Sequence, residues 1–310
     1  MILKRLPILH LCHHADYTVP RVQNGAPVPD KYACVLAALR ESGVRMAVHA
    51  PDPMPSEWIA AVHDPDYVNQ VLSAAVPREK ERRIGYAVTP EIALRSRLTV
   101  GGTWLAASLA LRHGFAANAA GGSHHALADT GAGYCVFNDL IISANRLIAE
   151  QDVDRILILD LDVHQGDGTA ALTAERDDIV TISLHAERNF PVRKARSTID
   201  VPLPDDLDDD GYLTALAQTL TAALDRHRPD LILYQAGVDP HRDDRLGRLG
   251  LSSAGLLARD RMVMREARRR AIPLASTLGG GYGNDMHVIG RRHAATILAL
   301  AEAAEAPVIG

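Results

Sequence analysis

One short segment of the chain concentrates ionisable side chains directly after an apolar run. Asp160, Asp162 and His164 occupy alternating positions there. In an extended backbone, residues two apart point to the same side, so we expect these three side chains to lie together. They would repel and lose solvation unless a cation or hydrogen-bond partners compensated them. We favour a metal site over an exposed acidic turn, because Gly166 and Gly168 also indicate a tight loop.

A second apolar run, residues 231–238, leads into another carboxylate, Asp239. The carboxyl ends of parallel strands meet at one edge of a sheet, so Asp162, His164 and Asp239 would form a three-ligand site. Two carboxylates and one imidazole with a position left for water are typical of a catalytic zinc site rather than a closed structural one. Taken alone, Asp239 would fit a turn or capping role equally well.

Two adjacent histidines, His124 and His125, lie in a glycine-rich segment. A single histidine is more often structural, but these two could act as acid and base beside surplus carboxylates. Asp160 and Asp167 are not needed as metal ligands and could each accept the far ring N–H of one histidine. Tyr282, in a run of glycines, could donate its phenol hydrogen to a developing oxyanion. These groups predict a metal-dependent hydrolase.

The elements that must position these residues alternate between short β-rich runs and amphipathic helical patterns. This alternation predicts one α/β domain of three layers, α/β/α, around a mainly parallel sheet. Polar segments at 121–138, 188–204 and 239–250 are expected to be loops at strand ends, where such folds place their chemistry. The expected strands cover residues 155–159, 179–184, 231–234, 272–276 and the start, Met1–His10; the expected helices cover 90–114, a segment capped by Asn138, 211–227, 253–270 and 285–304.

Composition limits the possible functions. A chain of 310 residues with 47% hydrophobic residues supports a single domain over residues 1–310. A formal charge of -5 does not favour nucleic acid or anionic membrane as a partner, so a small or peptide substrate fits better. Cys12, Cys34 and Cys135 are too scattered for a disulfide framework. Without a cleavage site or spanning segment, we expect a soluble cytoplasmic protein whose oligomeric state is open.

The helix expected over residues 253–270 is rich in arginine. Such a cluster could be a binding patch, but on an amphipathic helix it is more simply a solvated face. We therefore expect a solvated face to carry Arg259, Arg261, Arg265, Arg268, Arg269 and Arg270.

Ordered motifs along nearly the whole chain resemble those of the zinc-dependent histone deacetylase family, within the arginase/deacetylase fold, and particularly its class IV-like microbial branch. The resemblance implies a substrate with an acylated amine, most specifically an acylated lysine in a protein or peptide. It also implies the zinc, histidine-pair and oxyanion roles already given. The motifs are Gly121-Gly-Ser-His124-His125-Ala, Gly133-Tyr134-Cys135-Val-Phe-Asn138-Asp139, Asp160-Leu-Asp162-Val-His164-Gln-Gly-Asp167-Gly, Ser183-Leu-His-Ala-Glu-Arg-Asn-Phe190-Pro, Ala236-Gly-Val-Asp239 and Gly279-Gly-Gly-Tyr282.

The resemblance also implies a substrate channel and a second cation. Gly133, Tyr134 and Phe190 would wall an acyl-lysine channel, with Leu246 and Gly280 as further substrate-binding positions. Tyr134 stands where the family commonly has Phe, which leaves the acyl preference open. A structural potassium ion would lie under the zinc, held by Asp160, Ser183 and the backbone carbonyls of Asp162, His164 and Leu184.

Three alternatives remain. A binuclear manganese hydrolase of the arginase type would need further ligands, but Gly166 stands two residues after His164, and Asp239 is followed by Pro-His. An acetylpolyamine hydrolase would use the same site with a carboxylate gate, and the aligned position is Leu246. A non-catalytic acyl-lysine binding protein would be expected to lack Tyr282 or one of the paired histidines, and all are present.

Overall fold

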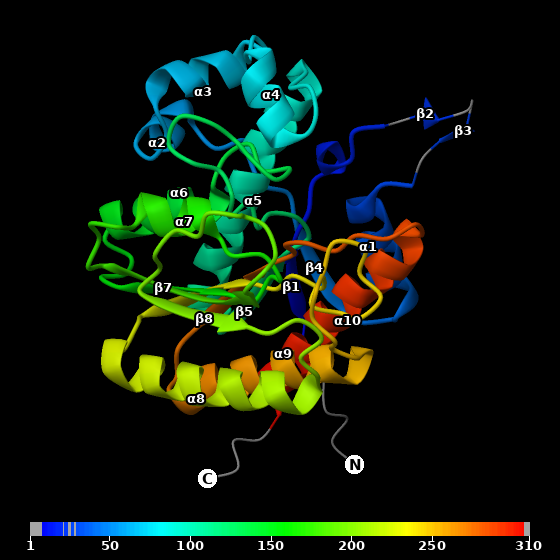
Figure 1. Cartoon of the computed structure of the whole chain (residues 1–310), viewed down its shortest axis with the longest axis vertical. Coiled ribbons are helices and arrows are strands. Elements are labelled where there is room, and N and C mark those ends of the chain that lie inside the picture. Colours follow the sequence, from blue (N-terminus) through cyan, green and yellow to red (C-terminus); the bar gives the residue numbers. More distant parts are fainter. Residues whose placement is uncertain (1–7, 21, 24–25, 28, 307–310) are drawn as a thin grey trace.

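A parallel β-sheet forms the centre of the molecule (Figure 1). The computed structural model describes residues 8–20, 22–23, 26–27 and 29–306. Within them, eight strands form one sheet whose neighbouring pairs all run parallel. In spatial order these are β4 (Met46–His49), β1 (Leu9–Cys12), β5 (Phe115–Asn118), β10 (Leu274–Thr277), β9 (Leu231–Gln235), β6 (Ile156–Asp160), β7 (Ile179–Ala186) and β8 (Ile199–Leu203). A separate antiparallel pair consists of β2 (Val22–Gln23) and β3 (Ala26–Pro27).

Helices cover both faces of the sheet, and alternate strand residues pack against each set. In β6, Leu157 and Leu159 join one apolar cluster, while Ile156 and Ile158 join another. The first cluster includes residues of α1 (Lys31–Glu41), α8 (Asp209–His227), α9 (Ser253–Arg269) and α10 (Met286–Glu305). The second includes residues of α5 (Pro90–His113) and α6 (Asp139–Ala149). The three-layer α/β/α fold predicted from the sequence is therefore confirmed.

The remaining helices are short. A 3₁₀ helix spans Ala15–Tyr17, and the short helix α7 (Asp167–Leu172) follows β6. Above α5 in Figure 1 lie α2 (Ser56–Ala60), α3 (Pro65–Leu72) and α4 (Arg78–Ile84). Residues of these three helices form a smaller apolar cluster with the first half of α5.

Most predicted elements are present, with boundaries shifted by a few residues. The predicted cap is confirmed, because the Asn138 side chain accepts the Ile141 N–H at the start of α6. The segment 188–204, expected to be a loop, contains β8, an edge strand whose pattern is interrupted by Pro202. The first strand lies at Leu9–Cys12, later than predicted, and residues 1–7 of the prediction lie outside the described residues.

The prediction that the arginines of α9 form a solvated face is wrong for one of them. Arg259 is 0% exposed. It lies in the same buried stripe of α9 as Leu256, Val263 and Ala267, which face the sheet. Arg265 and Arg269 are exposed, as expected.

The loops that follow the central strands begin at the same height along the strand direction, because the last residues of these strands are paired in register. The strand register pairs Asp160 with both Gln235 and Ser183, and Gln235 with Thr277. The segments after β6, β9 and β10 therefore leave the sheet side by side at its carboxyl edge. Because β6 ends at Asp160, the residues after it lie in a loop rather than in an extended strand.

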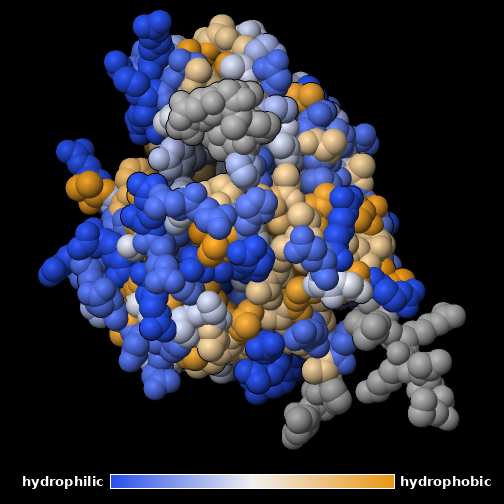
Figure 2. All heavy atoms as spheres, turned by 90° about the vertical axis from the view of Figure 1, so that its right-hand side faces the viewer, coloured by the Kyte–Doolittle hydropathy of each residue, from blue (hydrophilic) through white to orange (hydrophobic). Residues whose placement is uncertain are grey.

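Among the helices of the described ranges, none is both long enough and apolar enough to cross a membrane. Hydrophilic residues are interspersed with hydrophobic ones over the face shown in Figure 2.

Candidate metal and catalytic site

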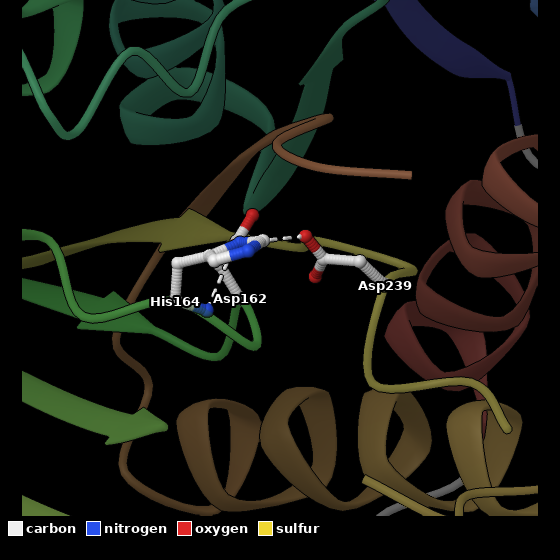
Figure 3. Close-up of side chains that lie close together, drawn as sticks. All are labelled: Asp162, His164 and Asp239. Atoms are coloured by element: carbon white, nitrogen blue, oxygen red, sulfur yellow. Dashed lines mark hydrogen bonds and ion pairs between the residues drawn. The ribbon is translucent and has the colours of Figure 1, made fainter. Parts of the chain in front are cut away.

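Asp162, His164 and Asp239 meet at the carboxyl edge of the sheet (Figure 3). Nδ1 of His164 lies 3.0 Å from Oδ1 of Asp162 and 3.2 Å from Oδ2 of Asp239. One ligand atom of each residue lies within 4.8 Å of the other two, and all three residues are buried. Two carboxylates and one imidazole in this arrangement can hold a divalent cation and leave room for water.

The two buried carboxylates of this group provide negative charge that a metal cation could compensate. Oδ2 of Asp239 is buried without a hydrogen-bond partner. Burial, reinforced by the charge of Asp162, raises the pKa of Asp239 to about 7. Burial acts against the charged form of His164, but its hydrogen bond to Asp162 and the adjacent Asp239 carboxylate raise its pKa to about 10. With protein groups alone, a proton on His164 thus compensates the carboxylates, and a bound metal would displace it.

Backbone N–H groups hold both carboxylates. Gly280 donates to Oδ2 of Asp162 at 2.6 Å, and Val163 donates to Oδ1 of Asp239 at 2.9 Å. A side chain at Gly280 would collide with the Asp239 carboxylate, and one at Gly237 would come within 2.6 Å of Oδ2 of Asp162. Glycine is therefore needed where the backbone approaches the ligands. The Gly280 backbone thus packs against the carboxylates of two candidate metal ligands, Asp162 and Asp239.

Each of the two adjacent histidines is paired with a carboxylate. Nδ1 of His124 lies 2.7 Å from Oδ2 of Asp160, and Nδ1 of His125 lies 2.7 Å from Oδ1 of Asp167. Because both pairs use Nδ1, Nε2 of each ring is left for other interactions. Nε2 of His124 lies 3.8 Å from Oδ1 of Asp162. The histidine pair thus adjoins the candidate metal group.

The pKa values of the two imidazoles are shifted in opposite directions. Burial acts against the charged form of both rings, but the charge of Asp160 raises the pKa of His124 to about 9. Burial and the neighbouring His124 lower the pKa of His125 to about 4. The Asp167 side chain is 16% exposed, so solvent weakens its opposing effect. At neutral pH His125 can accept a proton while His124 can donate one.

Tyr282 lies beside the metal group. Its ring centroid is 6.2 Å from that of His164. Burial, followed by the charges of Asp162 and Asp239, raises the pKa of the phenol well above 10, so the hydroxyl remains a hydrogen-bond donor. The Tyr282 backbone N–H donates to Oδ2 of Asp244 at 2.7 Å, which ties its loop to the one after β9.

Large hydrophobic side chains at three of the positions expected to bind substrate are exposed to solvent. Tyr134 is 53% exposed, and Phe190 and Leu246 are 42% and 43% exposed. The Phe190 ring stands edge-on to His125, with centroids 4.8 Å apart. A side chain at Gly133 would come within 2.5 Å of Cδ2 of His125. Of the residues predicted to wall a channel, Phe190 and Gly133 thus pack against His125.

Three buried polar side chains that the sequence analysis did not single out hold the surrounding loops. Asp139 accepts the N–H groups of Gly122 and Ser123, directly before the histidine pair. Gln235 donates to the Gly122 carbonyl at 2.8 Å. Asp244 accepts two N–H groups of its own loop besides that of the tyrosine loop. The signal that could have found them is a polar residue next to an apolar run, which needs a partner when buried.

The residues expected to hold potassium are neighbours in the sheet. Asp160 and Ser183 are paired in register. Their oxygens already have partners: those of Asp160 accept the Asp162 N–H and contact His124, and Oγ of Ser183 lies 3.0 Å from Nδ1 of His185. Within the described residues, neither side chain has a buried polar atom lacking a partner. The geometry therefore does not itself call for a second cation.

Comparison with known sequences places the chain in one family. The histone deacetylase domain matches residues 26–299. An uncharacterized protein of Picosynechococcus sp. is 42% identical over 284 residues, which cover 91% of this chain and 94% of that protein. Histone deacetylase 2 of Arabidopsis thaliana is 32% identical over 72% of this chain and 60% of its own length. A histone deacetylase-like amidohydrolase of Pseudomonas aeruginosa is 35% identical over 48% of this chain and 42% of its own length.

Solved structures share the fold. An acetylpolyamine aminohydrolase from Burkholderia pseudomallei superposes with a TM-score of 0.75 at 21% identity, covering 94% of this chain and 98% of that one. The HD domain of HDA15 gives a TM-score of 0.80 at 19% identity, covering 96% and 90%. At these identities the likeness supports the arginase/deacetylase fold rather than an activity. The domain match over most of the chain, on this fold and around this site, shows that the protein belongs to the histone deacetylase family.

Proposed function

We propose that this protein is a zinc-dependent amidohydrolase that removes the acyl group from an acylated lysine in a protein or peptide, with residues 1–310 acting as one catalytic domain. The buried group of Asp162, His164 and Asp239 beside the histidine pair carries the proposal. Two oxygen donors and one nitrogen donor suit zinc in a catalytic site. Relatives named as deacetylases and as an amidohydrolase support the class of reaction.

In this proposal, different side chains accept a proton, donate a proton and stabilise the oxyanion during amide hydrolysis. When bound, zinc supplies Lewis-acid polarisation of the acyl carbonyl and of a water molecule. His125 accepts the water proton through Nε2, while Asp167 holds its Nδ1. His124 protonates the leaving amine, which would otherwise be too basic to depart. Tyr282 donates to the carbonyl oxygen as negative charge develops.

We expect Tyr282→Phe to lower kcat with a smaller effect on KM. The substitution deletes one hydroxyl and keeps the ring, so it should remove an interaction made mainly in the transition state. Loss of one oxyanion donor costs about 10²–10³-fold, equivalent to about 2.7–4 kcal/mol. Steady-state kinetics on an acetyl-lysine peptide would measure the split between kcat and KM.

Zinc content provides the control for that variant. Tyr282→Phe should retain zinc, because the phenol is not one of the proposed ligands. A wild-type kcat would contradict the oxyanion role. Loss of zinc would instead show that Tyr282 supports the metal group.

We infer a lysine substrate rather than a polyamine from the residue at position 246. The Leu246 carbonyl accepts the Asn189 side chain at 2.8 Å, which places it beside Phe190. A polyamine carries a second ammonium group, and the apolar Leu246 side chain offers it no opposite charge. An acetylpolyamine or another small acylated amine remains the competing substrate for the same chemistry.

A substrate panel tests the proposal. We expect zinc-loaded protein to hydrolyse acetyl-lysine or longer acyl-lysine peptides with a kcat/KM at least about tenfold above that for N-acetylpolyamines, a difference of about 1.4 kcal/mol in the barrier. Leu246→Glu should raise turnover of the polyamines. A higher kcat/KM for polyamines would contradict the lysine assignment. Zinc binding and peptide binding without turnover of any substrate would indicate a non-catalytic acyl-lysine binding protein.

We retain the structural potassium ion as part of the proposal on the strength of the motif resemblance. Asp160, Ser183 and three neighbouring carbonyl groups would hold it. No step of the mechanism above depends on this ion.

A further inference from the structure

The bulkiest of the fully buried side chains in the described residues is an arginine under the metal site. Arg259 and its neighbour Asp260 are both 0% exposed. Nε of Arg259 donates to Oδ1 of Asp260 at 2.9 Å, and the Tyr234 hydroxyl donates to the same oxygen at 2.6 Å. Burial acts against the charge, but Asp260 and Tyr234 raise the pKa of Arg259 above its usual value, so the guanidinium stays charged. Apolar residues of similar size often fill such a space at lower cost in free energy. The pairing with Asp260 alone therefore does not explain why an arginine is buried here, and the contacts of its other N–H groups matter.

Nη1 of Arg259 connects the two loops that carry the candidate metal ligands, whereas Nη2 is buried without a hydrogen-bond partner. Nη1 of Arg259 donates to the Gly237 carbonyl at 2.7 Å and to the Leu161 carbonyl at 3.3 Å. Leu161 immediately precedes Asp162, and Gly237 lies two residues before Asp239. Figure 3 shows α9, in golden tones, passing below the three ligand side chains. One guanidinium thus joins segments from two different strands directly beneath the metal group.

The spacing between the two loops is tight enough for this link to matter. A side chain on Gly237 would come within 2.6 Å of Oδ2 of Asp162, so the Gly237 backbone already packs against a carboxylate of the other loop. A shift of the Gly237 carbonyl would change this contact and the path of the chain to Asp239. A planar guanidinium fixes the direction of its N–H groups, whereas a lysine ammonium is a point charge on a flexible stem.

We propose that Arg259 is a positioning residue that fixes the separation of the Asp162 and Asp239 loops and thereby sets the affinity of the site for its metal. It acts through backbone carbonyls and touches neither the ligand side chains nor the substrate. The inference rests on the metal site of the proposed function, but its test measures metal binding rather than turnover.

Arg259→Lys is the first test, because it keeps a positive charge near Asp260 and removes the planar donor pair. Groups that support metal ligands typically account for about 10–100-fold in metal affinity. We expect the zinc dissociation constant, measured on metal-free protein by competition with a chromogenic chelator, to rise by about 10–100-fold. The visible spectrum of the cobalt-loaded protein should also change, since it reports the geometry of the ligands.

Tyr234→Phe is the matched control. It removes the hydroxyl bonded to Asp260 and leaves both carbonyl contacts of Arg259, so zinc affinity and the cobalt spectrum should match wild type. The combined variant Arg259→Met, Asp260→Leu, Tyr234→Phe removes both buried charges and the hydroxyl, so no unpaired charge is left to prevent folding. It should fold, as judged by circular dichroism and thermal unfolding of the metal-free protein, and still bind zinc more weakly.

Wild-type zinc affinity and an unchanged cobalt spectrum in folded Arg259→Lys protein would overturn the positioning role, even if its melting temperature fell. The same result in the combined variant would overturn it independently. Wild-type protein that binds no zinc would overturn the proposed function itself, and this inference with it.

Discussion

Asp162→Ala, His164→Ala and Asp239→Ala should each lose zinc and activity together. Within the part of the chain that the structure describes, these three residues form the group that could hold a metal ion, so each of them should be needed. Because loss of a group that merely supports a ligand costs about 10–100-fold in metal affinity, loss of a ligand should cost more than about 100-fold. Zinc content after gel filtration and kcat/KM for an acyl-lysine peptide would measure both effects in the same samples.

Asp243→Ala provides a matched control from the same loop as Asp239. Its side chain is 68% exposed and pairs at 3.3 Å with Arg292, whose side chain is 13% exposed. Because solvent screens the Asp243 carboxylate, this pair should contribute about 0–1 kcal/mol. This variant should keep both zinc and activity. Chelators should inactivate the wild type, and hydroxamates, which bind zinc through two oxygens, should inhibit it. Full zinc occupancy in all three alanine variants would rule out the proposed ligands.

Most strands at the centre of the sheet could be predicted because they are apolar at nearly every position, although the interior strand β5 was not among the predicted ones. A parallel strand covered on both faces needs hydrophobic residues on both sides, as in β6 and β9. The edge strands lack this pattern. In β4 every residue is partly or fully exposed, and β8 contains Pro202. Edge strands pack on fewer neighbours, so their sequences are less constrained.

The meeting of Asp162 with Asp239 could also be predicted, because β6 and β9 are parallel neighbours and their loops leave the same edge. The expected alternation of Asp160, Asp162 and His164 is present, because the intervening residues Leu161 and Val163 pack into the apolar cluster instead. The regular strand that was expected to carry it is shorter. β6 ends at Asp160, and the chain then turns. Asp160 contacts His124, while Asp162 and His164 lie together with Asp239. Hydrophobic patterns locate a strand better than its last residue.

Residue type alone misled the prediction for Arg259. Its position in α9 indicates a buried side chain instead. A three- and four-residue spacing places on one helix face the residues Leu256, Arg259, Val263 and Ala267. All four are buried. A charged residue within an apolar stripe needs a buried partner, and the adjacent Asp260 supplies it. The carbonyls that the guanidinium reaches could not be predicted, since they belong to distant loops.

His125→Ala should retain zinc and lose most of its turnover. Burial and the neighbouring His124 lower the pKa of His125 to about 4, so this imidazole is neutral at neutral pH and its Nε2 is available to accept a proton. Removal of a positioned proton-transfer group costs about 10²–10⁴-fold. The loss should fall on kcat, because the substituted ring is not a proposed metal ligand. Steady-state kinetics and zinc content would separate these effects.

Chemical rescue can distinguish proton transfer from a structural role of His125. Its ring lies against Phe190 and Gly133 at the partly exposed approach to the site, so its removal should leave a space that solutes can enter. Added imidazole should restore part of the rate to His125→Ala, with a dependence on pH that follows the neutral form of the added base. Asp167→Asn, which keeps a polar partner at Nδ1, should cause a smaller loss than His125→Ala. A near-normal rate in His125→Ala would contradict the base assignment. Lost zinc would show that the ring supports the metal group instead.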